Sequence, residues 1–282
     1  MKNFFKQLGK AICYFLLYFG GQLLVSIGYI MLYSFKATLE ATMNGGVPDV
    51  NAISIEAAEY LLKQQNNVVN ISGIFTILFL VLFFLIRKKN VIKEVTAVKA
   101  PGKNYLIGVG VAFGYMLVIN FGLQFLPESW LEAYGAQSNM LLEGSDLAIF
   151  VSTVIMAPLV EELIFRGLML SRLRKGMSDW AAILISGFIF GLAHGQILWM
   201  SYTFIMGILL GLVAVKSESL LPSLALHMIF NLGGVVLTLL PGEIASTGLY
   251  IAMLAIGVVT TVALLVVLLK QKKAEKEIAQ AA

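Results

Sequence analysis

The chain places charged side chains inside a stretch that is otherwise apolar enough to cross a lipid bilayer. In Ala157 to Leu170, APLVEELIFRGLML, Glu161 and Glu162 are adjacent and Arg166 follows four residues after Glu162. Insertion scales put the cost of one charge at a helix centre at about 2.5 to 3.5 kcal/mol, so these groups need partners or a polar cavity. On an α-helix Glu162 and Arg166 lie one above the other and can form an ion pair, whereas Glu161 lies about 100° around the axis. The spacing predicts a structural role for the pair and a chemical role for Glu161.

The two histidines of the chain also lie in apolar runs, each with a partner four residues away. Phe190 precedes His194 in FGLAH, and His227 precedes Asn231 in HMIFN. A single histidine on a buried helix is usually structural, but polar groups at membrane depth on separate helices tend to face one another. A carboxylate and an imidazole could orient a water molecule and take its proton. A second imidazole and a carboxamide could donate hydrogen bonds to the oxyanion formed when that water attacks a carbonyl. Together with Glu161, this set suits hydrolysis.

The composition favours a membrane protein to hold these groups. Of 282 residues, 59% are apolar and only 13% are charged, which leaves too little polar surface for a water-soluble globule. The long, unbroken apolar runs are typical of helices and not of barrel strands. The one cysteine, Cys13, allows neither an internal disulfide nor a thiolate metal cluster. We therefore expect an all-α, polytopic membrane protein of about eight transmembrane helices with a buried polar active-site cavity. The expected spans are 11–35, 71–86, 104–126, 147–170, 180–194, 198–215, 220–240 and 248–269.

These spans predict three parts of the chain. Residues 1–145 would form three transmembrane helices with an extracytoplasmic loop at 36–70, in which Ser54 could cap a short amphipathic helix. Residues 146–240 would form the catalytic core, and 241–282 the last transmembrane helix and a basic cytoplasmic tail. The segment between the third and fourth spans reads as a loop.

The distribution of lysine and arginine predicts the orientation in the membrane. If the amino terminus is cytoplasmic, almost all basic residues of the connecting segments fall on the cytoplasmic side, and only Lys36 and Lys63 fall outside. This sorting predicts a multi-pass protein of the cell membrane with both termini in the cytoplasm and the lipid bilayer as a partner. We expect no nucleic-acid partner. Because Glu161 lies beyond the midpoint of its span, we expect access to the site from the cytoplasmic side.

Three short motifs, EExxxR, FxxxH and HxxxN, occur in this order across the fourth, fifth and seventh expected spans. In this the chain resembles the CAAX protease and bacteriocin-processing (CPBP) family of intramembrane glutamic endopeptidases, over roughly residues 146–240. The resemblance implies that Glu161 and His194 activate the attacking water, and that His227 and Asn231 bind the oxyanion.

The same resemblance gives Glu162, Arg166 and Phe190 supporting or substrate-side roles. It also implies an endopeptidase that acts on membrane-associated protein or peptide substrates, lipidated or membrane-embedded, without a cofactor.

Other functions use the same residues. In a zinc-dependent membrane metalloprotease, His194, His227 and a glutamate would hold the metal, as in sites with three protein ligands. Against this reading, the sequence contains no HExxH. From a different class, the buried charges could serve a proton-coupled transporter, or a non-proteolytic immunity or scaffold protein that keeps them for packing.

Straight helices raise a difficulty for the expected site. At about 1.5 Å per residue, they put His194 near the outer end of the fifth span and His227 near the inner end of the seventh, too far apart to meet. A turn at Gly195 and Gln196, or helix tilt, would have to bring them together. Glycines at every fourth residue would let the fifth and sixth helices approach closely. These glycines are Gly187, Gly191 and Gly195 on the fifth, and Gly207 and Gly211 on the sixth.

Overall fold

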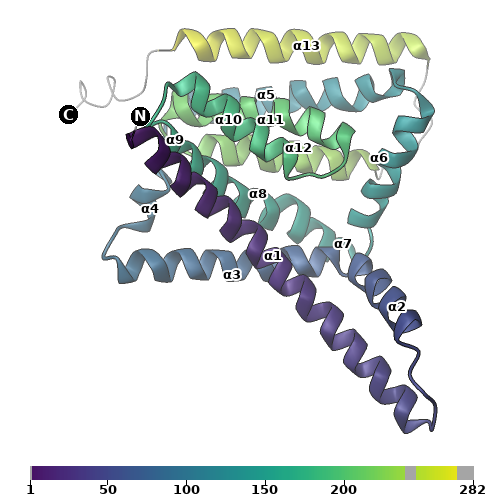
Figure 1. The fold of residues 1–282 in the computed structure, drawn as a ribbon. Coiled ribbons are helices and arrows are strands. Elements are labelled where there is room, and N and C mark those ends of the chain that lie inside the picture. The colour runs from purple at the N-terminus through teal and green to yellow at the C-terminus, as the bar shows by residue number, and fades with distance from the viewer. Residues whose placement is uncertain (1, 239–245, 272–282) are drawn as a thin grey trace.

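The computed structural model describes residues 2–238 and 246–271, and all regular elements in this part of the chain are helices (Figure 1). The α-helices are α1 (Lys2–Met43), α2 (Val50–Lys63), α3 (Gln65–Ile86), α4 (Val91–Glu94), α5 (Gly102–Gly122), α6 (Glu128–Leu141), α7 (Asp146–Ile149), α8 (Ala157–Glu161), α9 (Ser171–Leu173), α10 (Asp179–Leu192), α11 (Ile197–Ser217), α12 (Leu221–Thr238) and α13 (Thr247–Lys270). A 3₁₀ turn, η1 (Leu123–Phe125), follows α5, and two π-helical segments, η2 (Phe150–Met156) and η3 (Glu162–Leu170), flank α8.

Within the described residues, six helices are long and apolar enough to cross a membrane. They are Asn3–Met43, Gln65–Ile86, Gly102–Phe125, Asp146–Leu173, Ile197–Ser217 and Thr247–Lys270. Two shorter apolar helices, α10 and α12, lie at the fifth and seventh expected spans. The predicted all-α polytopic membrane fold is therefore confirmed. The 14 residues of α10 cover only about 21 Å, less than the roughly 30 Å of a hydrocarbon core.

Two segments expected to be loops are largely helical. Most of 36–70 belongs to α1, α2 and the start of α3. Helix α1 continues past its expected end to Met43, because residues 36–43 contain neither glycine nor proline, and Gly45, which has φ +73°, follows. The cap of α2 is Asp49, which accepts from two backbone N–H groups, and not Ser54. Between the third and fourth spans lies α6. Leu240, the expected end of the seventh span, and Lys272, Lys273 and Lys276 of the basic tail lie outside the described residues.

Helices from the three expected parts of the chain pack against one another. Helix α1 contacts η3, and α5 lies between α12 and α13. The contact between α5 and α13 is close because both helices present glycine. A Cβ on Gly257 would be 2.7 Å from the carbonyl oxygen of Gly114.

Polar contacts join the segments at one end of the bundle, where the amino terminus, the end of α3 and the helices α4 and α9 come together (Figure 1). We call this end the basic end. Glu94 accepts hydrogen bonds from Lys89, at 2.8 Å, and from Arg172, at 2.6 Å. The hydrogen bond from Lys89, the largest effect, lowers the pKa of Glu94 below its usual value. Arg174 pairs with Asp179 and Glu218, and so links α9 to α10 and α11.

Candidate active site

The two adjacent glutamates lie on one continuous helix, Asp146–Leu173, that is π-helical on both sides of α8. Pro158 stands in the first turn of α8 and has no N–H to donate, so the regular hydrogen-bond ladder is interrupted there. Glu161 is the last residue of α8 and Glu162 the first of η3. π-Helical turns are rare and occur frequently at functional sites.

Glu162 and Arg166 form the predicted ion pair. The Nη1 group of Arg166 donates to Oε1 of Glu162 at 2.9 Å, and both side chains are 0% exposed. The guanidinium also donates to the carbonyl of Gly207 on α11 and lies 4.3 Å from the ring centroid of Phe190 on α10. The pair therefore joins the glutamate helix to two neighbouring helices.

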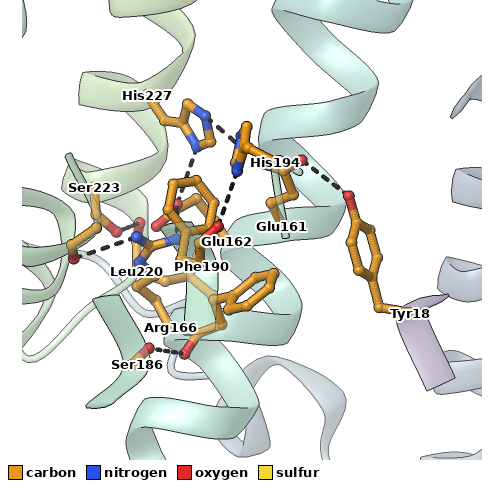
Figure 2. Close-up of polar contacts among 12 residues, drawn as sticks. Tyr18, Glu161, Glu162, Arg166, Ser186, Phe190, His194, Leu220, Ser223 and His227 are labelled. Atoms are coloured by element: carbon orange, nitrogen blue, oxygen red, sulfur yellow. Dashed lines mark hydrogen bonds and ion pairs between the residues drawn. The ribbon is translucent and has the colours of Figure 1, made fainter. Parts of the chain in front are cut away.

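His227 of α12 lies close to both glutamates (Figure 2). Its Nδ1 is 3.1 Å from Oε1 of Glu162, and its Nε2 is 3.7 Å from Oε2 of Glu161. Because the Glu162 carboxylate accepts from Nδ1, it orients the ring so that Nε2 points toward Glu161. An imidazole oriented by a second carboxylate is a recurring feature of catalytic sites.

Glu161 is held by a residue that the sequence motifs do not include. The hydroxyl group of Tyr18 on α1 donates to Oε1 of Glu161 at 2.9 Å (Figure 2). A tyrosine that becomes buried usually finds a hydrogen-bond partner for its hydroxyl group. The position of Tyr18 in an apolar run is therefore the one indication that the sequence gives of such a contact. The partner is 143 residues away, so no local spacing could identify it.

His194 lies on the turn after α10 and faces His227 (Figure 2). Its Nδ1 donates to the carbonyl of Phe190 at 2.9 Å, which in the neutral ring leaves the lone pair on Nε2. The ring of Phe190 contacts both imidazoles, with centroid distances of 4.9 Å and 5.8 Å. The two histidines thus meet, because α10 ends at Leu192, too short to carry His194 to the outer end of a span. The chain then turns at Gly195, which has φ +74°.

Asn231 lies one turn after His227 on α12. Its Nδ2 group donates to the carbonyl of Thr153 in η2 at 2.9 Å. An amide nitrogen carries two hydrogens, so this bond fixes the side chain and leaves a second donor.

The four residues expected to be catalytic line one cavity of about 530 Å³, together with Phe190 and Tyr18. They are Glu161, His194, His227 and Asn231. Glu162 and Arg166 are not among its lining residues and lie behind the cavity wall. The structure therefore separates the two glutamates as their spacing predicted.

The cavity extends toward α6 and the ends of α5 and α12, where Tyr134, Gln124 and Leu237 line it. This is the end of the bundle opposite the basic end. Toward the basic end the cavity is bordered by η3, whose Phe165 lines it, and the expected access from the cytoplasmic side stays a prediction. Phe165 and Leu168 of η3 are both 0% exposed.

The zinc alternative requires three ligands grouped around one point. Among the described residues, no three His, Cys, Asp or Glu side chains form such a group. Both nitrogens of His227 face glutamate oxygens, and Nδ1 of His194 is bound to a backbone carbonyl.

A helical membrane bundle that gathers a carboxylate, two imidazoles and a carboxamide around one cavity has the composition of an intramembrane hydrolase. Residues 143–233 match the family model described as type II CAAX prenyl endopeptidase Rce1-like, and they contain all three motifs. The predicted family is thereby confirmed: this segment is an Rce1-like domain of the CPBP type, a family of membrane proteases.

One curated relative is similar beyond this segment. The "Uncharacterized 24.3 kDa protein" of Escherichia coli is 27% identical over 183 residues, which are 62% of this chain and 82% of the relative. No solved structure matches the chain significantly.

Proposed function

We propose that this protein is an intramembrane endopeptidase in which Glu161 and His194 activate a water molecule for attack on a peptide bond. The observation that supports it is the convergence of three helices. Glu161, His194, His227 and Asn231 line one cavity, while the buried Glu162–Arg166 pair lies behind it.

In the proposed reaction, a water molecule lies between Oε2 of Glu161 and the imidazole of His194. The hydroxyl group of Tyr18 already occupies Oε1 of Glu161, which leaves Oε2 for the water. The water loses one proton to this pair as its oxygen bonds to the carbonyl carbon. The proton is then delivered to the amide nitrogen as the C–N bond breaks, so the first products are a carboxylic acid and an amine. The acid then gives its remaining proton to the amine or to water and becomes a carboxylate.

The developing oxyanion needs hydrogen-bond donors that are already in place. Asn231 can supply its second amide hydrogen, because the first is bound to Thr153. His227 donates to Glu162 through Nδ1, so it can donate to the oxyanion through Nε2 as an imidazolium. If both glutamates are ionised, their two negative charges are balanced by Arg166 and this imidazolium. The buried cluster is then neutral, which limits the free-energy cost of holding it in the membrane.

The proposed substrates are membrane-associated proteins or peptides, because the cavity is enclosed by the membrane-spanning helices. A chain that is lipidated, or that is itself embedded, would be held by the bilayer beside these helices. In this proposal the reaction uses no cofactor. The protein lies in the cell membrane with its basic end in the cytoplasm, as the distribution of lysine and arginine suggests.

The test compares Glu161→Gln with the parent by quantitative proteomics of membrane fractions. Glutamine keeps the size of the side chain but cannot take a proton from water. We expect the substrates to accumulate and their cleaved products to fall at least about 100-fold, the lower limit for loss of general base catalysis. The matched control is Glu128→Gln, which removes an exposed carboxylate from α6. If the product levels of Glu161→Gln equal those of the parent, the proposed mechanism is wrong.

A further inference from the structure

Outside the catalytic cavity, α1 and α3 border a long crevice on the surface of the bundle. On α1, Lys10, Tyr14, Leu17, Gly21 and Leu24 follow one another at spacings of four and three residues and therefore share one face. The facing stripe repeats every fourth residue, with Ile71, Phe75, Phe79 and Phe83 on α3 and Arg87 directly after its last residue. Neither Glu161 nor either histidine lines this crevice.

The crevice is strongly positive where it reaches the basic end. A pocket of about 520 Å³ is lined there by Lys10, Arg87, Lys89 and Arg172, and no carboxylate lines it. Glu94 binds Lys89 and Arg172 from one side. In the described part of the chain, no carboxylate pairs with Lys10 or Arg87.

Arg172 also has an unused donor at this pocket. Its Nε atom is buried and has no hydrogen-bond partner among the described residues. A buried donor of this kind costs free energy unless a ligand or water satisfies it. The cluster therefore has the features of an anion site.

Beyond the positive pocket the crevice becomes an apolar trough of about 740 Å³. Thr76 and Tyr29 carry the only side-chain hydroxyls among its described lining residues. From Lys10 to Leu24 the whole crevice runs about 21 Å along α1, longer than the roughly 15 Å depth of one leaflet's hydrocarbon layer. A Cβ on Gly20, which lines the trough, would meet nothing within 4 Å.

We infer that this crevice binds one anionic phospholipid of the leaflet at the basic end. The lipid phosphate would lie between Lys10 and Arg87, and one acyl chain would lie in the trough. Charge complementarity selects this occupant, because a zwitterionic lipid would bring a cationic group beside the basic side chains together with its phosphate, and a soluble anion would leave the trough empty. The same helix α1 carries Tyr18, which does not line the crevice, so the lipid would support the helix that contacts Glu161.

The first test measures lipid binding to the purified full-length protein by native mass spectrometry. Phosphatidylglycerol and phosphatidylcholine with identical acyl chains are titrated separately, and we expect phosphatidylglycerol to bind at least tenfold more tightly. Each basic side chain near an anionic headgroup contributes about fivefold in affinity, so Lys10→Gln with Arg87→Gln should weaken phosphatidylglycerol binding about 25-fold. The control, Lys88→Gln with Lys99→Gln, removes two exposed lysines at the same end and should leave the affinity unchanged.

The second test addresses the trough. Gly20→Phe places a ring in the trough and should weaken phosphatidylglycerol binding at least fivefold. Gly9→Phe is the control, because Gly9 is also unobstructed but does not line the crevice. Equal binding of the two lipids, unchanged binding by the Lys10 and Arg87 double variant, or displacement of the lipid by equimolar inorganic phosphate would each overturn the inference.

Discussion

The buried pair of Glu162 and Arg166 allows a quantitative prediction about folding. Replacing Glu162 with glutamine leaves the guanidinium of Arg166, which is 0% exposed, without its carboxylate. Removing one partner of a buried ion pair typically costs about 3 to 5 kcal/mol. The glutamine carbonyl can still accept one hydrogen bond, which restores about 1 kcal/mol. We therefore expect Glu162→Gln to lower the free energy of unfolding by about 2 to 4 kcal/mol, or about 30- to 900-fold in the unfolding equilibrium constant.

The assay is reversible unfolding in mixed micelles, followed by circular dichroism, on the parent, Glu162→Gln, Arg166→Met and the double variant. The double variant should be more stable than Glu162→Gln, because it removes the unpaired cation as well. Glu128→Gln, on an exposed carboxylate, should change the free energy of unfolding by less than 0.5 kcal/mol, as surface substitutions usually do. A loss below 1 kcal/mol for Glu162→Gln, or a double variant whose loss equals the sum of the two single losses, would refute the reasoning.

Three further substitutions and one chelator treatment test other parts of the structure. Tyr18→Phe removes the hydrogen bond to the proposed water-activating glutamate and should lower kcat roughly tenfold with little change in KM, measured on a fluorogenic peptide in liposomes. Glu94 has a lowered pKa because Lys89 donates to it. Its stabilising contribution is therefore complete above its unfolded pKa of about 4.3 and is lost as the pH falls through its lower folded pKa, so melting temperatures between pH 6 and pH 3 should fall less steeply for Glu94→Gln. A Cβ on Gly207 would lie 2.7 Å from the Cα of Gly187, so Gly207→Ala should cost about 1 to 3 kcal/mol in a thermal melt. Treatment of the active protein with a chelator should leave cleavage unchanged, and loss of cleavage with recovery on adding zinc would favour the metalloprotease.

The parts of the site that depend on local spacing could be predicted from the sequence. Glu162 and Arg166 are four residues apart on one helix, so their contact follows from helix geometry alone. The same geometry separated Glu161 from that pair. The membrane class followed from composition, and its helical spans followed from long apolar runs.

The remaining parts depend on where helices end and on contacts between distant segments. Whether His194 and His227 come close together depends on the residue at which α10 ends. Gly195 indicated that the chain turns there, but not how deep in the membrane the turn lies. The contact of Tyr18 with Glu161 joins segments that no local pattern relates. The π-helical segments have one local signal, Pro158, and their extent depends on the helices packed around them. The continuation of α1 past residue 36 could have been expected, because no glycine or proline follows until Gly45.

The shortness of α10 has a consequence for the surrounding lipid. Its 14 residues cover about 21 Å, so a bilayer of ordinary thickness must become thinner beside it, or polar headgroups must move inward. Such hydrophobic mismatch costs only fractions of a kcal/mol per Å, which a membrane can accommodate locally. The indentation would form where α10 gives way to the turn that carries His194. There the headgroup layer and its hydration water would lie closest to the cavity. Water, the reactant that is scarce inside a membrane, would therefore have a short path to the site.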